Sequence, residues 1–112
     1  MVSPTVGDVV LVSFPFSDLS SSKLRPALVL AGTTNNDWIL CQITSKAYAD
    51  PQAIQIESAD FSFGSLHRTS YARPAKIFCA NSSIIKKVTG TLKKTVKNSI
   101  RDAIIEILKS AE

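Results

Sequence analysis

Cysteine, histidine and long apolar runs are all scarce in this chain. Its 112 residues include two cysteines, Cys41 and Cys79, and one histidine, His67. The two cysteines form no CxxC pair, which argues against both a disulfide framework and a cysteine-based zinc site. A single histidine excludes a histidine-rich metal site. We therefore expect a reduced compartment and a protein that needs neither a metal nor another cofactor.

The first residues contain no targeting pattern that we can identify. Met1 to Pro4 carry no basic segment, and Asp8 and Pro15 interrupt the apolar stretch that follows. This pattern fits neither a signal peptide nor a membrane span. We expect a cytoplasmic protein without a membrane partner.

The composition is that of a globular domain with an uneven charge distribution. Hydrophobic residues make up 45% of the chain, which excludes disorder, and no repeat or long linker divides it. We expect a single domain over residues 1–112. Residues 1–72 carry a net charge of −2 and residues 73–112 a net charge of +6. Such a basic region can attract a polyanion, although lysines on the solvated face of a surface helix would give the same count.

Short β-branched runs separated by turn residues predict a mainly β fold with one helix. The expected strands are residues 9–14, 25–31, 38–44, 53–57, 70–72 and 75–80, with a mobile loop over 17–24 and a turn over 61–64. Five to six or more antiparallel strands with local turns suggest a small barrel. Apolar residues from Leu92 to Leu108 recur at helical spacing and predict a C-terminal α-helix, for which Thr91 is a plausible N-cap.

The expected strands 25–31 and 38–44 form a central hairpin, in which two residues that could bind or act on a substrate are expected to face each other. If its turn centres between Thr34 and Asn35, Arg25 lies opposite Thr44. Directly opposed residues have Cβ atoms about 5 Å apart. A guanidinium and a hydroxyl would then meet at the open end of the hairpin, where they could bind a phosphate. The alternative is an arginine and a threonine with structural roles only.

Several segments together resemble the MazF/PemK family of toxin endoribonucleases. They are Val6 to Val12, Lys23 to Leu30, Ile43 to Lys46, Leu66 to Phe78, and Lys86 to Leu92 with the final helix. Each segment is short, but their order and spacing match the family over most of the chain. The resemblance implies an SH3-like barrel with a C-terminal helix, a homodimer and neutralisation by a cognate antitoxin protein. It also implies metal-independent, sequence-selective cleavage of single-stranded mRNA.

The resemblance assigns the functional pair to Arg25 and Thr44. Some members also carry an arginine and an aspartate at positions that align with Ser70 and Ala72, so the residue that acts as general base is unassigned here. An arginine is a poor base at neutral pH, and we therefore expect Arg25 to stabilise the transition state. Thr44 would orient the 2′-hydroxyl or the phosphate.

Further RNA contacts are expected from residues next to this pair. The candidates are Ser45, Lys46, Tyr71 and Arg73. Lys46 could equally be a solvated lysine, Tyr71 a packed side chain, and Arg73 a member of a surface ion pair. We assign no catalytic role to His67, because a single histidine between a loop and a strand is more often a surface or partly packed residue.

Two other functions are compatible with the same fold. Related barrel toxins inhibit DNA gyrase through aromatic residues near the C-terminus, whereas this chain ends in Leu108-Lys109-Ser110-Ala111-Glu112. The other alternative is a non-catalytic barrel that binds RNA or a protein.

Overall fold

The computed structural model describes residues 3–15, 22–46 and 50–111. These residues form seven strands, two short 3-10 helices and one α-helix. In chain order the elements are β1 (Asp8–Pro15), β2 (Ser22–Gly32), β3 (Asp37–Thr44), β4 (Ile54–Ile56), η1 (Ser58–Asp60), β5 (Phe61–Gly64), β6 (Ser70–Asn81), η2 (Ser82–Ile84), β7 (Ile85–Leu92) and α1 (Lys94–Ser110).

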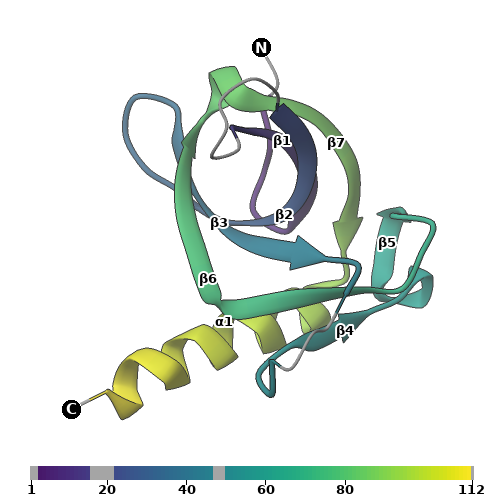
Figure 1. Cartoon of the computed structure of the whole chain (residues 1–112), viewed down its shortest axis with the longest axis vertical. Helices are drawn as coiled ribbons and strands as arrows, with labels where there is room; N and C mark the ends of the chain where they lie inside the picture. Colours follow the sequence, from purple (N-terminus) through teal and green to yellow (C-terminus); the bar gives the residue numbers. More distant parts are fainter. Residues whose placement is uncertain (1–2, 16–21, 47–49, 112) are drawn as a thin grey trace.

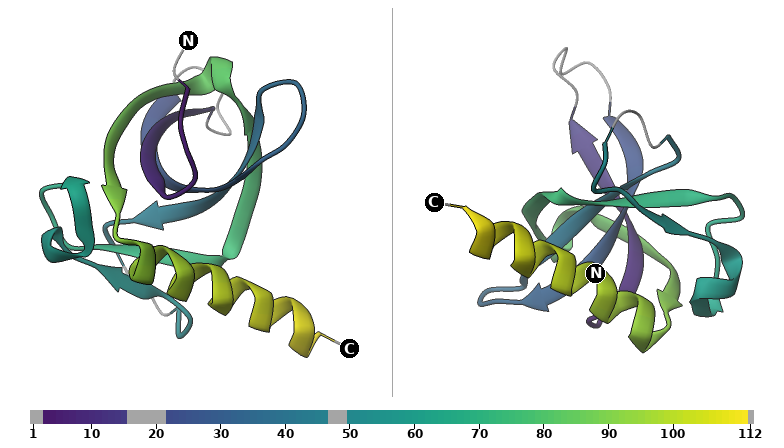
Figure 2. Two further views of the ribbon diagram at one scale, coloured as in Figure 1. Left: turned by 180° about the vertical axis from the view of Figure 1, so that it is seen from behind. Right: turned by 90° about the horizontal axis from the view of Figure 1, so that it is seen from below.

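All seven strands belong to one antiparallel sheet with the order β4-β6-β3-β2-β1-β7-β5. The sheet curls into a half-barrel, and α1 lies against its outside (Figures 1 and 2). The expected barrel with a C-terminal helix is therefore confirmed.

The continuous apolar run of β1 is explained by burial on both faces of the sheet. Val9 belongs to a core cluster that also contains Ile100 and Ile104 of α1. Val10 and Val12 belong to a second cluster, with residues of β2, β3 and β7. Neighbouring residues of one strand point to opposite faces, so β1 has an apolar partner on each side.

Some expected boundaries are wrong, and each has a local cause. The two segments 70–72 and 75–80 are parts of one strand, β6. The break that we expected is a bulge around Pro74, which cannot donate a hydrogen bond to the neighbouring strand. The expected turn at 61–64 is strand β5, which pairs with β7. Of the expected loop 17–24, residues 22–24 belong to β2 and residues 17–21 lie outside the described residues.

The expected N-cap is also wrong. Thr91 lies in β7, and its hydroxyl donates a hydrogen bond of 2.8 Å to Oδ1 of Asp8. The N-cap position of α1 is Lys93, whose side chain makes no capping bond. Its backbone N–H instead donates to the carbonyl of Asp60 at 2.8 Å. The start of the helix is thus fixed by a contact with η1, which is distant in sequence.

Candidate active site

A cleft of about 280 Å³ opens where β2 begins and β3 ends. Its walls come from β1, β2, β3 and the segment that leads into β6. Apolar and polar side chains both line it, and the apolar ones are Leu11, Leu24, Pro26, Ile43 and Leu66. The polar lining residues are Lys23, Arg25, Thr44, Ser45, Arg68 and Ser70.

The hairpin of β2 and β3 has the register that the sequence predicts over its central part. Ala27 pairs with Gln42, and the same register continues to Val29 and Leu40, before a bulge shifts it by one residue. Arg25 and Thr44 lie two residues beyond the Ala27–Gln42 pair. In this region β2 and β3 are no longer paired with each other: Arg25 pairs with Val12 of β1, and Thr44 pairs with Tyr71 of β6. Both residues line the cleft, so the structure brings the expected pair to one site.

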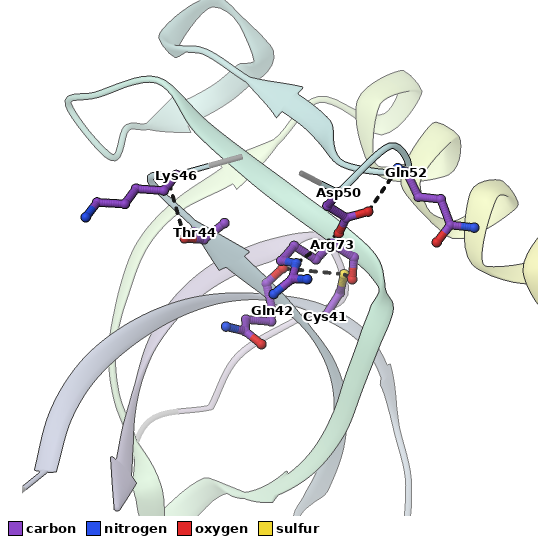
Figure 3. A network of polar contacts seen from close by, with 7 residues as sticks. All are labelled: Cys41, Gln42, Thr44, Lys46, Asp50, Gln52 and Arg73. Atoms are coloured by element: carbon purple, nitrogen blue, oxygen red, sulfur yellow. Dashed lines mark hydrogen bonds and ion pairs between the residues drawn. The ribbon is translucent and has the colours of Figure 1, made fainter. Parts of the chain in front are cut away.

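Thr44 is held in a fixed orientation by the turn that follows it. The side chain is buried, with 7% of its surface exposed. Its Oγ1 accepts a hydrogen bond of 3.2 Å from the backbone N–H of Lys46 (Figure 3). A hydroxyl can donate one hydrogen bond while it accepts another. Because the O–H of Thr44 has no acceptor within the described residues, it can donate to a ligand in the cleft.

The cleft is positively charged. Arg25 is half-buried, whereas Lys23 and Arg68 are exposed. Among the residues that line it, all of them in the described part of the chain, there is no aspartate or glutamate. Three basic side chains thus line one concave surface, and an arginine is able to bind two oxygens of a phosphate at once.

The other expected RNA contacts have different positions. Ser45 lines the cleft, whereas Lys46, Tyr71 and Arg73 do not. Lys46 is exposed and its side chain extends away from Asp50 (Figure 3). Tyr71 is half-buried in β6, where it pairs with Thr44.

Arg73 makes the ion pair that was the alternative to its expected RNA contact. Its Nε donates to Oδ2 of Asp50 at 2.9 Å, and the side chains are 22% and 9% exposed. This hydrogen bond, with a second one from the backbone N–H of Gln52, lowers the pKa of Asp50. The carbonyl of Arg73 also accepts a hydrogen bond from the thiol of Cys41 at 3.3 Å (Figure 3). Arg73 therefore ties the segment after β3 to the bulge of β6.

Sequence reasoning missed two basic residues of the cleft, Lys23 and Arg68, and it gave no role to Ser70. Lys23 is only two residues from Arg25 and falls in the segment that we expected to be a loop. Arg68 and Ser70 are distant in sequence from Arg25, and β6 brings them to the cleft because it pairs with β3. The sequence shows only that Arg68 is a basic residue just before a strand. That observation does not place Arg68 at the cleft unless β6 is known to be a neighbour of β3.

His67 does not line this cleft. It is exposed, and its backbone φ of 62° lies in the left-handed region. The described residues contain no group of three or more histidine, cysteine, aspartate or glutamate side chains that could hold a metal ion. In the same residues, no helix is long and apolar enough to cross a membrane.

Comparison with known proteins identifies both a family and a fold. Residues 5–108 match the family described as "PemK-like, MazF-like toxin of type II toxin-antitoxin system". A search of curated protein sequences gave no significant match.

Several solved structures share the fold at low sequence identity. MazF from Deinococcus radiodurans is 18% identical with a TM-score of 0.76, and the alignment covers 97% of this chain and 99% of that chain. A structure described as MazE-MazF from the same organism is 17% identical with a TM-score of 0.75, covering 96% of this chain and 97% of that chain. An endoribonuclease in complex with its cognate antitoxin, from a mycobacterial species, is 16% identical with a TM-score of 0.73 over 100% and 99% of the two chains.

Proposed function

Because the chain belongs to the PemK-like, MazF-like family of toxins of type II toxin–antitoxin systems, we propose that it is an endoribonuclease that cleaves single-stranded mRNA. The observation that carries this proposal is the cleft that joins Arg25 and Thr44. Its cations suit a phosphodiester, and its volume of about 280 Å³ suits a small group such as one phosphate with part of its sugar.

In the proposed reaction the substrate supplies the nucleophile. The 2′-oxygen of one ribose attacks the neighbouring phosphorus while the bond from phosphorus to the 5′-oxygen breaks. A base removes the proton of the 2′-hydroxyl, and the leaving 5′-oxygen gains a proton. The products are a 2′,3′-cyclic phosphate and a 5′-hydroxyl. Negative charge grows on the non-bridging phosphate oxygens in the transition state, where fixed donors lower the barrier most.

We assign complementary roles to the two central residues. Arg25 donates to the non-bridging oxygens as their charge increases. Thr44 donates its O–H to orient the phosphate or the 2′-hydroxyl, while its Oγ1 accepts from the Lys46 N–H. Ser45 adds a hydroxyl beside it. Lys46, Tyr71 and Arg73 do not line the cleft, and we expect them to contact RNA only further along the strand.

We also propose two protein partners. The first is a second copy of the chain, because large apolar side chains are exposed; Leu24 and Phe63 are 53% and 68% exposed. The second is a cognate antitoxin, since the mycobacterial relative is described in complex with one. Sedimentation that shows only a monomer at micromolar concentration would contradict the homodimer. The cytoplasm, where mRNA is found, is the proposed location.

The test of the proposed function is cleavage without divalent metal. Purified protein is incubated with a long single-stranded RNA in EDTA, and the new 5′ ends are mapped. We expect cuts at a short recurring sequence, each with a 5′-hydroxyl. RNA that stays intact with wild-type protein would refute the proposal and favour a non-catalytic or gyrase-binding barrel.

A further inference from the structure

A second cleft lies beside the first and shares one wall with it. It has a volume of about 600 Å³ and is lined by Glu57, Ser58, Ala59, His67, Arg68 and Thr69. Arg68 lines both clefts. Arg68 is therefore the residue at which the two clefts adjoin.

Hydrogen bonds hold both walls of this second cleft. The hydroxyls of Ser58 and Ser65 are 3.1 Å apart and link η1 to the segment before β6. The Ser65 hydroxyl also accepts from the backbone N–H of His67 at 2.9 Å, and the Ser65 N–H donates to Thr89 of β7 at 3.3 Å. On the opposite wall, the N–H of Glu57 donates to Oδ2 of Asp60 at 2.8 Å, and the Glu57 carboxylate accepts in return from the backbone N–H of Asp60. A carboxylate has further acceptor positions beyond that one hydrogen bond.

The backbone at His67 is itself unusual. Its φ of 62° is rare for a residue other than glycine, and such a conformation persists only where its surroundings hold it. The contact with Ser65 supplies that support. This hydrogen bond thus helps to set the backbone of the segment that carries His67 and Arg68.

The chemistry of the second cleft differs from that of the first. The first has only cations among its charged residues, whereas the second combines Arg68 with the carboxylate of Glu57 and the imidazole of His67. Neither Glu57 nor Arg68 forms an ion pair within the part of the chain that the structure describes. A cleft that combines a flat imidazole with a charged donor and a charged acceptor matches an unpaired nucleobase, which has a π-face and a polar edge.

We propose that the second cleft binds one unpaired base next to the scissile phosphate, and that Glu57 makes it prefer bases with an amino group over uracil. This inference rests on the proposed function of the first cleft. The carboxylate of Glu57 accepts hydrogen bonds only, and cytosine, adenine and guanine each offer an amino group. Uracil presents two carbonyl oxygens on either side of one N–H, and these oxygens repel a carboxylate. Arg68 binds the phosphate between the two clefts.

The first arm of the test measures binding without cleavage. Octamers of 2′-O-methyl cytidine, adenosine and uridine lack the 2′-hydroxyl that attacks, so they remain intact. We expect wild-type protein to bind the uridine octamer about tenfold more weakly than the cytidine octamer. Glu57→Gln should reduce this ratio to about twofold or less, because an amide can also donate to a carbonyl oxygen.

Variants of the neighbouring residues separate the individual roles. Arg68→Ala should weaken binding of all three octamers by a similar factor, because a phosphate contact does not depend on the base. His67→Asn removes the imidazole but keeps a side chain that tolerates the left-handed backbone, and it should also weaken all three. Asp102→Asn, an exposed carboxylate on α1, is the matched control and should change neither affinity nor ratio.

The second arm measures base preference in cleavage. A random-sequence RNA pool is cut in EDTA, and base frequencies around the cuts are compared between wild type and Glu57→Gln. We expect one flanking position from which uracil is depleted in the wild type and at which the depletion is lost in the variant. Cleavage with the same base frequencies and octamer ratios in both proteins overturns the subsite but leaves the nuclease intact. Octamer binding that depends on Glu57, with no cleavage by wild type, supports the subsite and refutes the nuclease.

Discussion

Replacement of Arg25 by alanine is the sharpest perturbation of the proposed mechanism. Loss of one preorganised donor to a developing oxyanion typically slows a reaction by about 10² to 10³-fold. In this cleft Lys23 and Arg68 remain and still supply positive charge. We therefore expect the lower end of that range, about 100-fold, which corresponds to about 2.7 kcal/mol of transition-state stabilisation. Affinity for RNA should fall much less.

Arg25→Lys separates charge from geometry. Lysine restores the positive charge but cannot donate two parallel hydrogen bonds to a phosphate. We expect its rate to lie between those of the alanine variant and the wild type. Arg101→Ala is the matched control, because Arg101 is an exposed arginine on α1 whose ion pair is with its neighbour Asp102. It removes the same charge and should leave the rate unchanged.

The assay is single-turnover cleavage of a defined oligonucleotide by excess protein in EDTA. Under these conditions the rate reports the chemical step rather than product release, and binding is measured separately. Full activity of Arg25→Ala would refute the role of Arg25. Equal losses in Arg25→Ala and Arg101→Ala would show that only net charge matters. Activity lost in His67→Ala alone would move the reaction to the second cleft.

Three further predictions test the surroundings of the site. Thr44→Val should slow cleavage, whereas Thr44→Ser should keep most of the wild-type rate, because serine retains the Oγ that accepts the Lys46 N–H. Equal cleavage rates of the two variants would contradict a role for the hydroxyl. Asp50→Asn should be less stable than the wild type at pH 7, as shown by urea unfolding. Since the pKa of Asp50 is lowered in the folded state, this difference should disappear as the pH falls below the ordinary aspartate value of about 3.9. Burial raises the pKa of the Cys41 thiol to about 11, so iodoacetamide at about pH 8 should modify Cys41 only after unfolding, as measured by mass spectrometry. Equal labelling of folded and unfolded protein would be inconsistent with that burial.

Much of the fold follows from local patterns in the sequence. The β-branched runs of β1, β2 and β3 identify these strands, and helical spacing identifies α1. The central hairpin has a short turn, in which Asn35 and Asn36 both adopt positive φ, and a bulge after Val29 gives its central part the expected register. Asparagine tolerates that conformation better than most residues do. Arg25 and Thr44 could therefore be placed at the same end of the hairpin from the sequence, although β2 and β3 no longer pair with each other at these two residues.

The errors come from elements that are stabilised by distant partners. Strand β5 has a glycine at its end, and a Cβ at Gly64 would collide with the carbonyl oxygen of Thr89 in β7. The close pairing of β5 and β7 depends on this contact, which a local pattern does not contain. The start of α1 is likewise fixed by Asp60 rather than by a capping side chain next to it. A prediction based on neighbouring residues favours Thr91 there, and it misses the long-range bond.

Arg68 and Arg73 illustrate why site residues are harder to predict than strands. They are five positions apart, both are arginines, and both lie near the start of β6. They differ in whether a carboxylate lies within hydrogen-bond distance of the guanidinium. Arg73 has Asp50, which is 23 positions away in the sequence and 2.9 Å away in the structure. Arg68 has no ion-pair partner in the described part of the chain and lies where two clefts meet. A bound phosphate must compete with Asp50 for Arg73, whereas at Arg68 it meets no such competitor. Of the two arginines, Arg68 is therefore the one whose removal should cost the most affinity for RNA.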